Sequence, residues 1–194
     1  MLSQRNSLTP VRLLLLLLLA VAALFLALSS QATIMQRLEI EELARNSSDV
    51  FHGQVLSTQT YWNPDHTRIY TGIRLRINES FKSSGNNPAK RGEIVNVVQL
   101  GGEKDGVKMD YAGRPEFTAG ESAVLFTTRN RNNELTVVAL KQGKMRVEGQ
   151  VVSRDFSGLM LVDRTKASKE LQPVKAMTSQ LTMDELRQRI ARAR

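Results

Sequence analysis

The chain contains no cysteine, only two histidines, and few aromatic residues (5%). The absence of cysteine excludes a disulfide scaffold, a thiol enzyme and a thiolate metal site. His52 and His66 lack the spacing of a metal-ligating pair, and no Gly-x-Ser-x-Gly motif provides a serine nucleophile. We therefore expect no catalytic residue, no cofactor and no metal site. A hydrolase with an unrecognised site is the weaker alternative.

The first segment also lacks acidic residues, since none precedes Glu39. It contains Arg5 and Arg12, then the continuous apolar stretch Leu13–Leu28, then small residues up to Ala32. A basic start, an apolar stretch and a small-residue site are the three parts of a secretory signal peptide. Residues 1–32 are thus predicted to be a signal peptide that is cleaved after Ala32.

An uncleaved membrane anchor is the alternative to this prediction. The apolar stretch would span about 24 Å as a helix, which is short of a bilayer core of about 30 Å. Cleavage is favoured for this reason, and no stable membrane span is expected in the mature chain. Either way, the rest of the chain is exported, which predicts a periplasmic or extracellular location.

The formal charge of +8 is unevenly distributed along the chain. Residues 164–194 carry eight basic and three acidic side chains, whereas residues 33–163 carry seventeen and sixteen. The main body is therefore nearly neutral, and the excess lies in the tail. This distribution, together with the predicted export, argues against a nucleic-acid partner.

The mature sequence is dominated by a period of two. Ile69, Thr71 and Ile73 alternate with Tyr70, Gly72 and Arg74, and this pattern continues to Asn78, as expected for a half-buried antiparallel strand. Further strands are predicted at 49–62, 93–100, 123–128, 135–147 and 151–162, with a bulge at Gly53 and a long surface excursion over 101–121.

Helical signals lie at the two ends of the mature chain. Leu38–Ala44 has apolar residues at helical spacing, and Thr182 with Glu185 forms an N-cap signature before Leu186 and Ile190, with Leu181 placed to contact Leu186. The sequence thus predicts a mainly β chain. We expect a closed or nearly closed antiparallel barrel of about six strands, because closure removes exposed edges. A short N-terminal helix and a C-terminal helix flank it. The predicted domain covers 33–163, and a polar linker with a basic helix covers 164–194.

Five short motifs follow one another along the mature chain: Leu38–Leu43, Asp49–Val55, Arg114–Phe117 leading into Gly120 and Glu121, Gln142–Val147, and Leu181–Ile190. In this order they resemble a family of small secreted bacterial proteins with a netrin-like, oligonucleotide/oligosaccharide-binding (OB) type barrel. The tissue inhibitors of metalloproteinases share that architecture. Their mechanism uses an N-terminal cysteine, which is absent here. Protease inhibition is therefore implied only as an analogy of fold.

The most distinctive surface candidates surround the first predicted hairpin turn. They are Tyr61, Trp62, His66, Tyr70, Arg74 and Arg76. In OB-type barrels the second and third strands and the first hairpin loop form the usual ligand face, and aromatic rings beside arginine suit sugars or protein partners. The alternative makes Arg74 and Arg76 a solvated strand face and Trp62 a cover for one end of the barrel.

These features predict an exported, non-enzymatic binding module for a protein or glycan partner. A protease inhibitor that uses the Tyr61–His66 loop or the N-terminal segment is the alternative. An inhibitor would retain an active protease from an envelope extract, and a glycan binder would not.

Overall fold

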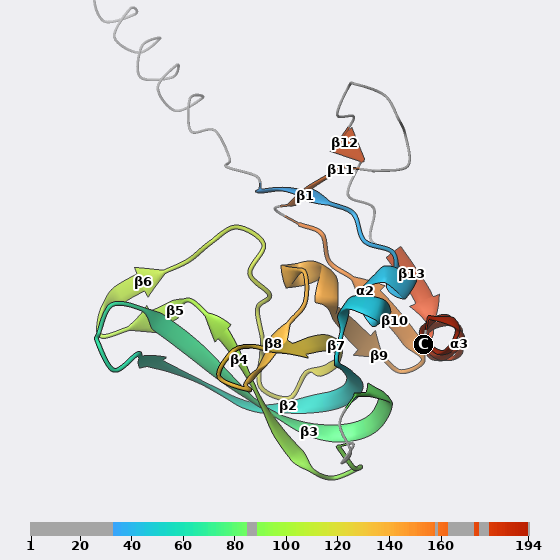
Figure 1. Cartoon of the computed structure of the whole chain (residues 1–194), viewed down its shortest axis with the longest axis horizontal. Helices are drawn as coiled ribbons and strands as arrows, with labels where there is room; N and C mark the ends of the chain where they lie inside the picture. Colours follow the sequence, from blue (N-terminus) through green and yellow to red (C-terminus); the bar gives the residue numbers. More distant parts are fainter. Residues whose placement is uncertain (1–32, 85–88, 158, 163–172, 175–178, 194) are drawn as a thin grey trace, which may run out of the picture. The chain divides into compact units, whose positions relative to one another are not determined.

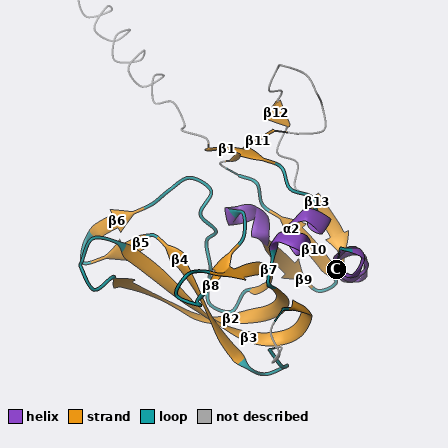
Figure 2. Cartoon of the chain, in the orientation of Figure 1, coloured by secondary structure: helices purple, strands orange, loops and turns teal. Residues whose placement is uncertain are grey.

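The computed structural model describes most of the chain after residue 32. The described residues are 33–84, 89–157, 159–162, 173–174 and 179–193. The predicted signal peptide and most of the predicted linker lie outside them. Strands dominate the described part (Figures 1 and 2), so the prediction of a mainly β chain is confirmed. No helix in this part is long and apolar enough to cross a membrane.

The described elements are mostly short strands, with one helix near each end. The strands are β1 (Thr33–Gln36), β2 (Asp49–Trp62), β3 (Ile69–Ser83), β4 (Ile94–Leu100), β5 (Gly102–Lys104), β6 (Val107–Met109), β7 (Ser122–Arg129), β8 (Leu135–Val137), β9 (Lys144–Glu148), β10 (Val151–Arg154), β11 (Leu159–Val162), β12 (Pro173–Val174) and β13 (Ser179–Thr182). The helices are α2 (Ile40–Asn46), α3 (Met183–Arg192) and a 3-10 turn, Leu140–Gly143.

Five of these strands pair in a ring, in the order β7-β2-β3-β4-β8 and back to β7. All neighbours are antiparallel except β4 and β8, which are parallel and are joined by the single register pair Val97 and Leu135. The ring is therefore closed over only part of its length. Strands β9, β10 and β13 extend the sheet from β7, while β1, β11 and β12 form a separate sheet and β5 and β6 a hairpin.

The alternation predicted for β3 is confirmed. Ile69, Ile73 and Ile77 are fully buried, whereas Arg74 and Arg76 are exposed. The buried residues from the middle of β3 join Phe51, Leu125 and others in a cluster of apolar side chains within the ring. Gly53 lies at a register shift between β2 and β3, where an added Cβ would be 2.6 Å from the Arg76 carbonyl oxygen. The predicted bulge at this glycine is therefore present, and close backbone approach is its physical reason.

Strand β7 separates two cores. Ala123 and Leu125 face the cluster within the ring, and Val124 and Phe126 face a second cluster that contains the apolar sides of α2 and α3. Because both faces of β7 are covered, its sequence is an apolar run instead of an alternating one.

Both helices begin with capping interactions. In α3 the Glu185 amide donates to Thr182 Oγ1 at 3.2 Å and the Thr182 amide donates to Glu185 Oε2 at 2.7 Å, as the sequence predicts. Leu181 packs against the cluster that contains Leu186. Helix α2 begins at Ile40 and so starts two residues later than predicted, since the Glu39 amide donates to Glu42 Oε2 at 2.9 Å and caps the helix there.

Two predicted strands are wrong in extent. The 135–147 segment is interrupted after Val137, where Ala139 and Leu140 adopt left-handed conformations (φ 53° and 57°) and lead into the 3-10 turn. The 151–162 segment is divided into β10 and β11. The excursion over 101–121 also contains a hairpin, β5–β6, which turns at Asp105 and Gly106, both with positive φ.

Candidate functional site

Tyr61 and Tyr70 form a stacked pair on the outer side of the sheet, in which Tyr61 is exposed and Tyr70 is half-buried. They are direct partners across β2 and β3, and their ring centroids lie 6.1 Å apart with 22° between the planes. A Cβ added to Gly72 would lie 3.4 Å from Tyr61 Cε1, so the ring lies over a position without a side chain. Tyr61 is 37% exposed. Burial of the remainder raises the pKa of the Tyr61 phenol, and the charge of Glu134 adds to this effect. The pair therefore presents a flat aromatic contact area.

Trp62 and His66 form a second stacked pair at the β2–β3 turn. Their rings lie 5.8 Å apart with 19° between the planes, and His66 has a positive φ of 52°. Trp62 Nε1 donates to Asp105 Oδ2 at 2.9 Å, and this bond is the main reason that the pKa of the Asp105 carboxyl is lowered. Trp62 thus connects the β2–β3 turn to the β5–β6 hairpin. It belongs to none of the three buried clusters of the described residues.

Arg74 and Arg76 project from the same side of β3 as Tyr70 and are exposed. Neither arginine has an ion pair among the described residues. Arg74 is four residues from Tyr70, which is about 13 Å along a strand. The six predicted residues therefore divide between the two sides of the sheet. Tyr61, Tyr70 and, further along the outer face, the arginine pair (Arg74 and Arg76) lie on one side, whereas Trp62 is the register partner of the buried Ile69 and points with its hydrogen bond toward the β5–β6 hairpin on the other side. Tyr61, Trp62, His66 and Tyr70 together form an aromatic surface around the hairpin end.

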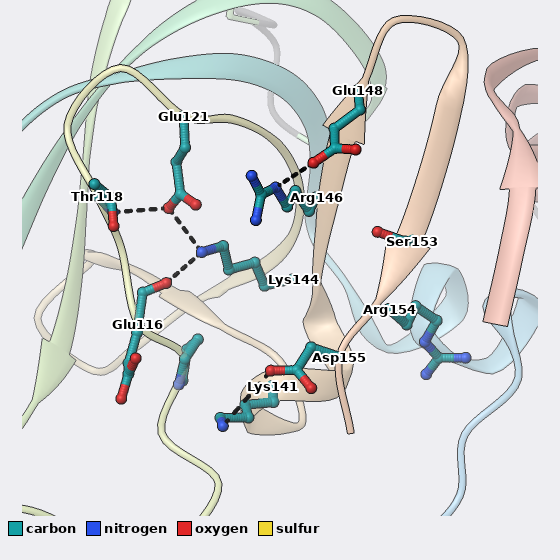
Figure 3. A pocket seen from close by; sticks show the side chains of 11 residues that line it. Glu116, Thr118, Glu121, Lys141, Lys144, Arg146, Glu148, Ser153, Arg154 and Asp155 are labelled. Atoms are coloured by element: carbon teal, nitrogen blue, oxygen red, sulfur yellow. Dashed lines mark hydrogen bonds and ion pairs between the residues drawn. The ribbon is translucent and has the colours of Figure 1, made fainter. Parts of the chain in front are cut away.

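A polar cavity of about 460 Å³ lies elsewhere on the molecule and was not predicted. Lys144 lies at its centre (Figure 3), where Nζ is 2.7 Å from Glu121 Oε1 and also donates to the Glu116 carbonyl oxygen. The same ammonium lies 4.5 Å from the centre of the Phe117 ring, and the Thr118 amide donates to Glu121 at 3.0 Å. Lys144 therefore fixes the 115–121 segment onto β9.

Several other charged groups of this cavity also have partners. Arg146 Nε is 2.9 Å from Glu148 Oε1, and Lys141 Nζ is 3.8 Å from Asp155 Oδ2. The Arg154 side chain points away from the centre of the cavity (Figure 3) and donates to the Leu38 carbonyl oxygen at 2.9 Å. The cavity thus brings together two motifs on which the family resemblance depends, 114–121 and 142–147. Their residue types gave no signal of these contacts.

His52 is half-buried and hydrogen-bonded. Its Nε2 lies 2.7 Å from Ser122 Oγ, and burial lowers the pKa of the imidazole, which the charge of Glu79 opposes. Both oxygens of Glu79 accept hydrogen bonds from Arg187, at 2.9 and 2.8 Å. This carboxylate is therefore occupied by an arginine and does not complete a serine–histidine–acid arrangement. In the described part of the chain, no group of three or more His, Asp or Glu residues is placed to hold a metal ion.

No protein-family model matches the chain, and no curated protein matches it in sequence. The aromatic surface, the arginine pair and the strands that carry them are therefore the features that bear on function.

Proposed function

We propose that the chain is an exported, non-enzymatic binding module for a protein or glycan, and that the aromatic surface and the arginine pair contact this partner. The observation that carries the proposal is the stacked pair of the exposed Tyr61 and the half-buried Tyr70 beside Gly72. Tyrosine, tryptophan and arginine are the side chains that most often dominate binding energy. Here Tyr61, Tyr70 and the two arginines lie on one face, Trp62 lies beside them at the hairpin end, and neither arginine has an ion pair among the described residues.

We further propose that the ring is an OB-type barrel of the netrin-like kind. In chain order its strands are β2, β3, β4, β7 and β8, and the fifth returns to lie beside the third. OB-type barrels bind ligands on the second and third strands, between the loop that joins strands one and two and the loop that joins strands four and five. The aromatic surface occupies the first of these loops and the adjacent strands. Glu134, in the second loop, acts on the pKa of Tyr61.

The state of the charged groups favours binding over catalysis. The Lys144–Glu121, Arg146–Glu148 and Lys141–Asp155 pairs leave the polar cavity with balanced charges. Catalytic acids and bases need a carboxylate or imidazole that is placed to exchange a proton with a substrate. These carboxylates are hydrogen-bonded or ion-paired within the protein, as is typical of structural residues.

Partner capture should depend on the candidate residues while folding does not. Trp62→Ala, and separately the double variant Arg74→Ala/Arg76→Ala, should each weaken capture from an envelope extract by about 2 kcal/mol or more of binding free energy. Arg146→Ala removes another exposed arginine, which lies on β9 and outside this face, and serves as the control. Thermal melts accompany each pull-down. A Trp62→Ala variant that melts early but still captures its partner would show that Trp62 has a structural role. Retention of an active protease would identify the module as an inhibitor.

The export part of the proposal has its own test. Strand β1 begins at Thr33, so a chain cut after Ala32 retains every described element. N-terminal sequencing of the exported protein should therefore start at or near Thr33. An intact Met1 in the membrane fraction would contradict cleavage and support the anchor.

A further inference from the structure

Strand β2 has an open edge over its second half. Its pairing with β7 ends at Gln54, after which the Val55 amide donates to the Glu121 carbonyl oxygen at 2.9 Å. Its pairing with β3 continues to Trp62. Residues 56–62 thus have β3 on one side and no strand of the described residues on the other. The ring closes only the first half of β2, so the expectation that closure removes the exposed edges does not hold here.

The hydrogen-bond pattern of the β2–β3 hairpin determines which backbone groups face this open side. The Asn63 amide donates to the Arg68 carbonyl oxygen at 2.8 Å, so this pair is hydrogen-bonded. Hydrogen-bonded and non-hydrogen-bonded pairs alternate along an antiparallel ladder. The N–H and C=O groups of Thr58, Thr60 and Trp62 therefore point toward the open edge, and those of Gln59 and Tyr61 point toward β3.

Beyond the bulge at Leu56, this edge has none of the usual protection against pairing. Proteins protect exposed edges with charged side chains, proline or bulges. Residues 56–62 read Leu-Ser-Thr-Gln-Thr-Tyr-Trp, with no charge and no proline, and the last register shift lies between Val55 and Ser57. Threonine, tyrosine and tryptophan also favour strands. The segment is thus well suited to accept a further strand.

The arginine pair determines the chemistry of that strand. Arg74 is the register partner of Ser57, so it projects from the strand next to the open edge. Arg76 is the register partner of Gln54, which still pairs with β7, so it lies just beyond the end of this edge. The small Ser57 side chain leaves room for a long guanidinium side chain to reach across β2, and neither arginine is ion-paired within the described chain. An added strand that carries acidic side chains on the outer face would supply the missing partners.

We propose that the partner is a protein whose extended, acidic segment adds as a strand beside residues 56–62 of β2. Backbone hydrogen bonds to Thr58, Thr60 and Trp62 would supply affinity, and Tyr61 and Arg74 would contact side chains on the outer face of the added strand, with Arg76 just beyond its end. This inference rests on the proposed function and narrows its partner to an acidic polypeptide.

The test uses a labelled short peptide of alternating Glu and Val, with its ends blocked. A Lys/Val peptide and a Glu/Pro peptide, which has the same charge but cannot pair as a strand, are the comparison probes. Fluorescence anisotropy should show that the mature protein binds Glu/Val and neither of the others. Thr58→Pro removes an edge N–H and should weaken binding at least about tenfold. Thr58→Ala retains that N–H and should bind like the parent protein.

Hydrogen exchange on the unsubstituted protein provides a measurement that does not depend on folding of the proline variant. The Thr58 and Thr60 amides should become protected when the Glu/Val peptide is added, whereas the Gln59 and Tyr61 amides, which already face β3, should change little. Equal binding of Glu/Pro, or unchanged exchange at Thr58 and Thr60, overturns the proposal. So does a dimer of the free protein that Thr58→Pro abolishes, because a second copy would then occupy the edge.

The two proposals fail in different ways. If Trp62→Ala loses the captured partner while Thr58→Pro retains it, the binding surface stands and strand addition is wrong. If neither variant changes capture, the surface itself is wrong. If the captured partner is released by a glycan and not by the Glu/Val peptide, the proposed binding surface stands, but its ligand is a saccharide and not an acidic strand.

Discussion

Ile73→Asp should lower the free energy of unfolding by about 3 kcal/mol or more, whereas Arg74→Asp should lower it by less than about 1 kcal/mol. The Ile73 side chain has no exposed area and lies in the cluster within the ring, in contact with the cores of β2, β4 and β7. An aspartate there would lose this apolar burial and would place an unpaired carboxylate in the cluster. Arg74, one residue later, is exposed on the opposite face. Denaturant titrations of both variants measure the difference.

Arg74→Asp has a second use as a folded control. It should melt close to the parent protein but lose partner capture, because it places a negative charge where an acidic partner is expected. Equal shifts of the denaturant midpoint for the two variants would show that the alternation of β3 does not separate core from solvent.

The alternation of β3 could be predicted because, in a half-buried strand, the period of two between apolar and polar residues indicates which side chains face the core. The run from Leu135 to Val147 could not, since its apolar residues fit one strand as well as two elements. The run is interrupted by a chain reversal that only the tertiary structure shows. Ala139 and Leu140 adopt left-handed conformations, and a Cβ added to Gly143 would lie only 2.0 Å from the Val138 carbonyl oxygen. The reversal directs Gln142 into the protein, and neither propensity nor spacing indicates this.

The charge of the basic tail could be read from the sequence, but its ion-pair partners could not. Its excess of arginine is visible in the sequence, but the partners are far away along the chain. Arg187 is bidentate with Glu79, and Arg189 lies 2.6 Å from Glu41. Arg187 and Arg189 thus attach α3 to β3 and α2. They are not free to form a basic surface.

Part of the candidate surface could be predicted from the sequence and part could not. The period of β3 places Tyr70, Arg74 and Arg76 on one face, and the position of the turn places Tyr61 near them. The hydrogen bond from Trp62 to Asp105 depends on the β5–β6 hairpin, which lies in a stretch without strand periodicity. The polar cavity was not predictable, because Lys144 meets Glu121 only after the 115–121 segment folds back onto β9.

Gln142→Leu should destabilise the protein by about 3 kcal/mol, since each buried polar group left without its bond costs about 1–3 kcal/mol. Gln142 is fully buried. Its Nε2 donates to the Gln36 carbonyl oxygen and its Oε1 accepts from the Leu38 amide, both at 2.9 Å. Leucine has a similar volume but satisfies neither group. The amide of Leu38 should therefore exchange faster, and the segment between β1 and α2 should become the first site of limited proteolysis.

The matched control is Gln188→Leu, which makes the same change at an exposed position of α3 and should shift stability by no more than about 0.5 kcal/mol. Arg154 also donates to the Leu38 carbonyl oxygen, and β1 pairs with β11, so two other contacts hold this segment. If Gln142→Leu melts at the same temperature as the control and the Leu38 amide stays protected, these two contacts are sufficient to hold the segment. If it is destabilised as expected, the side chain that the 3-10 turn directs inward is what holds the first residues of the domain against the sheet.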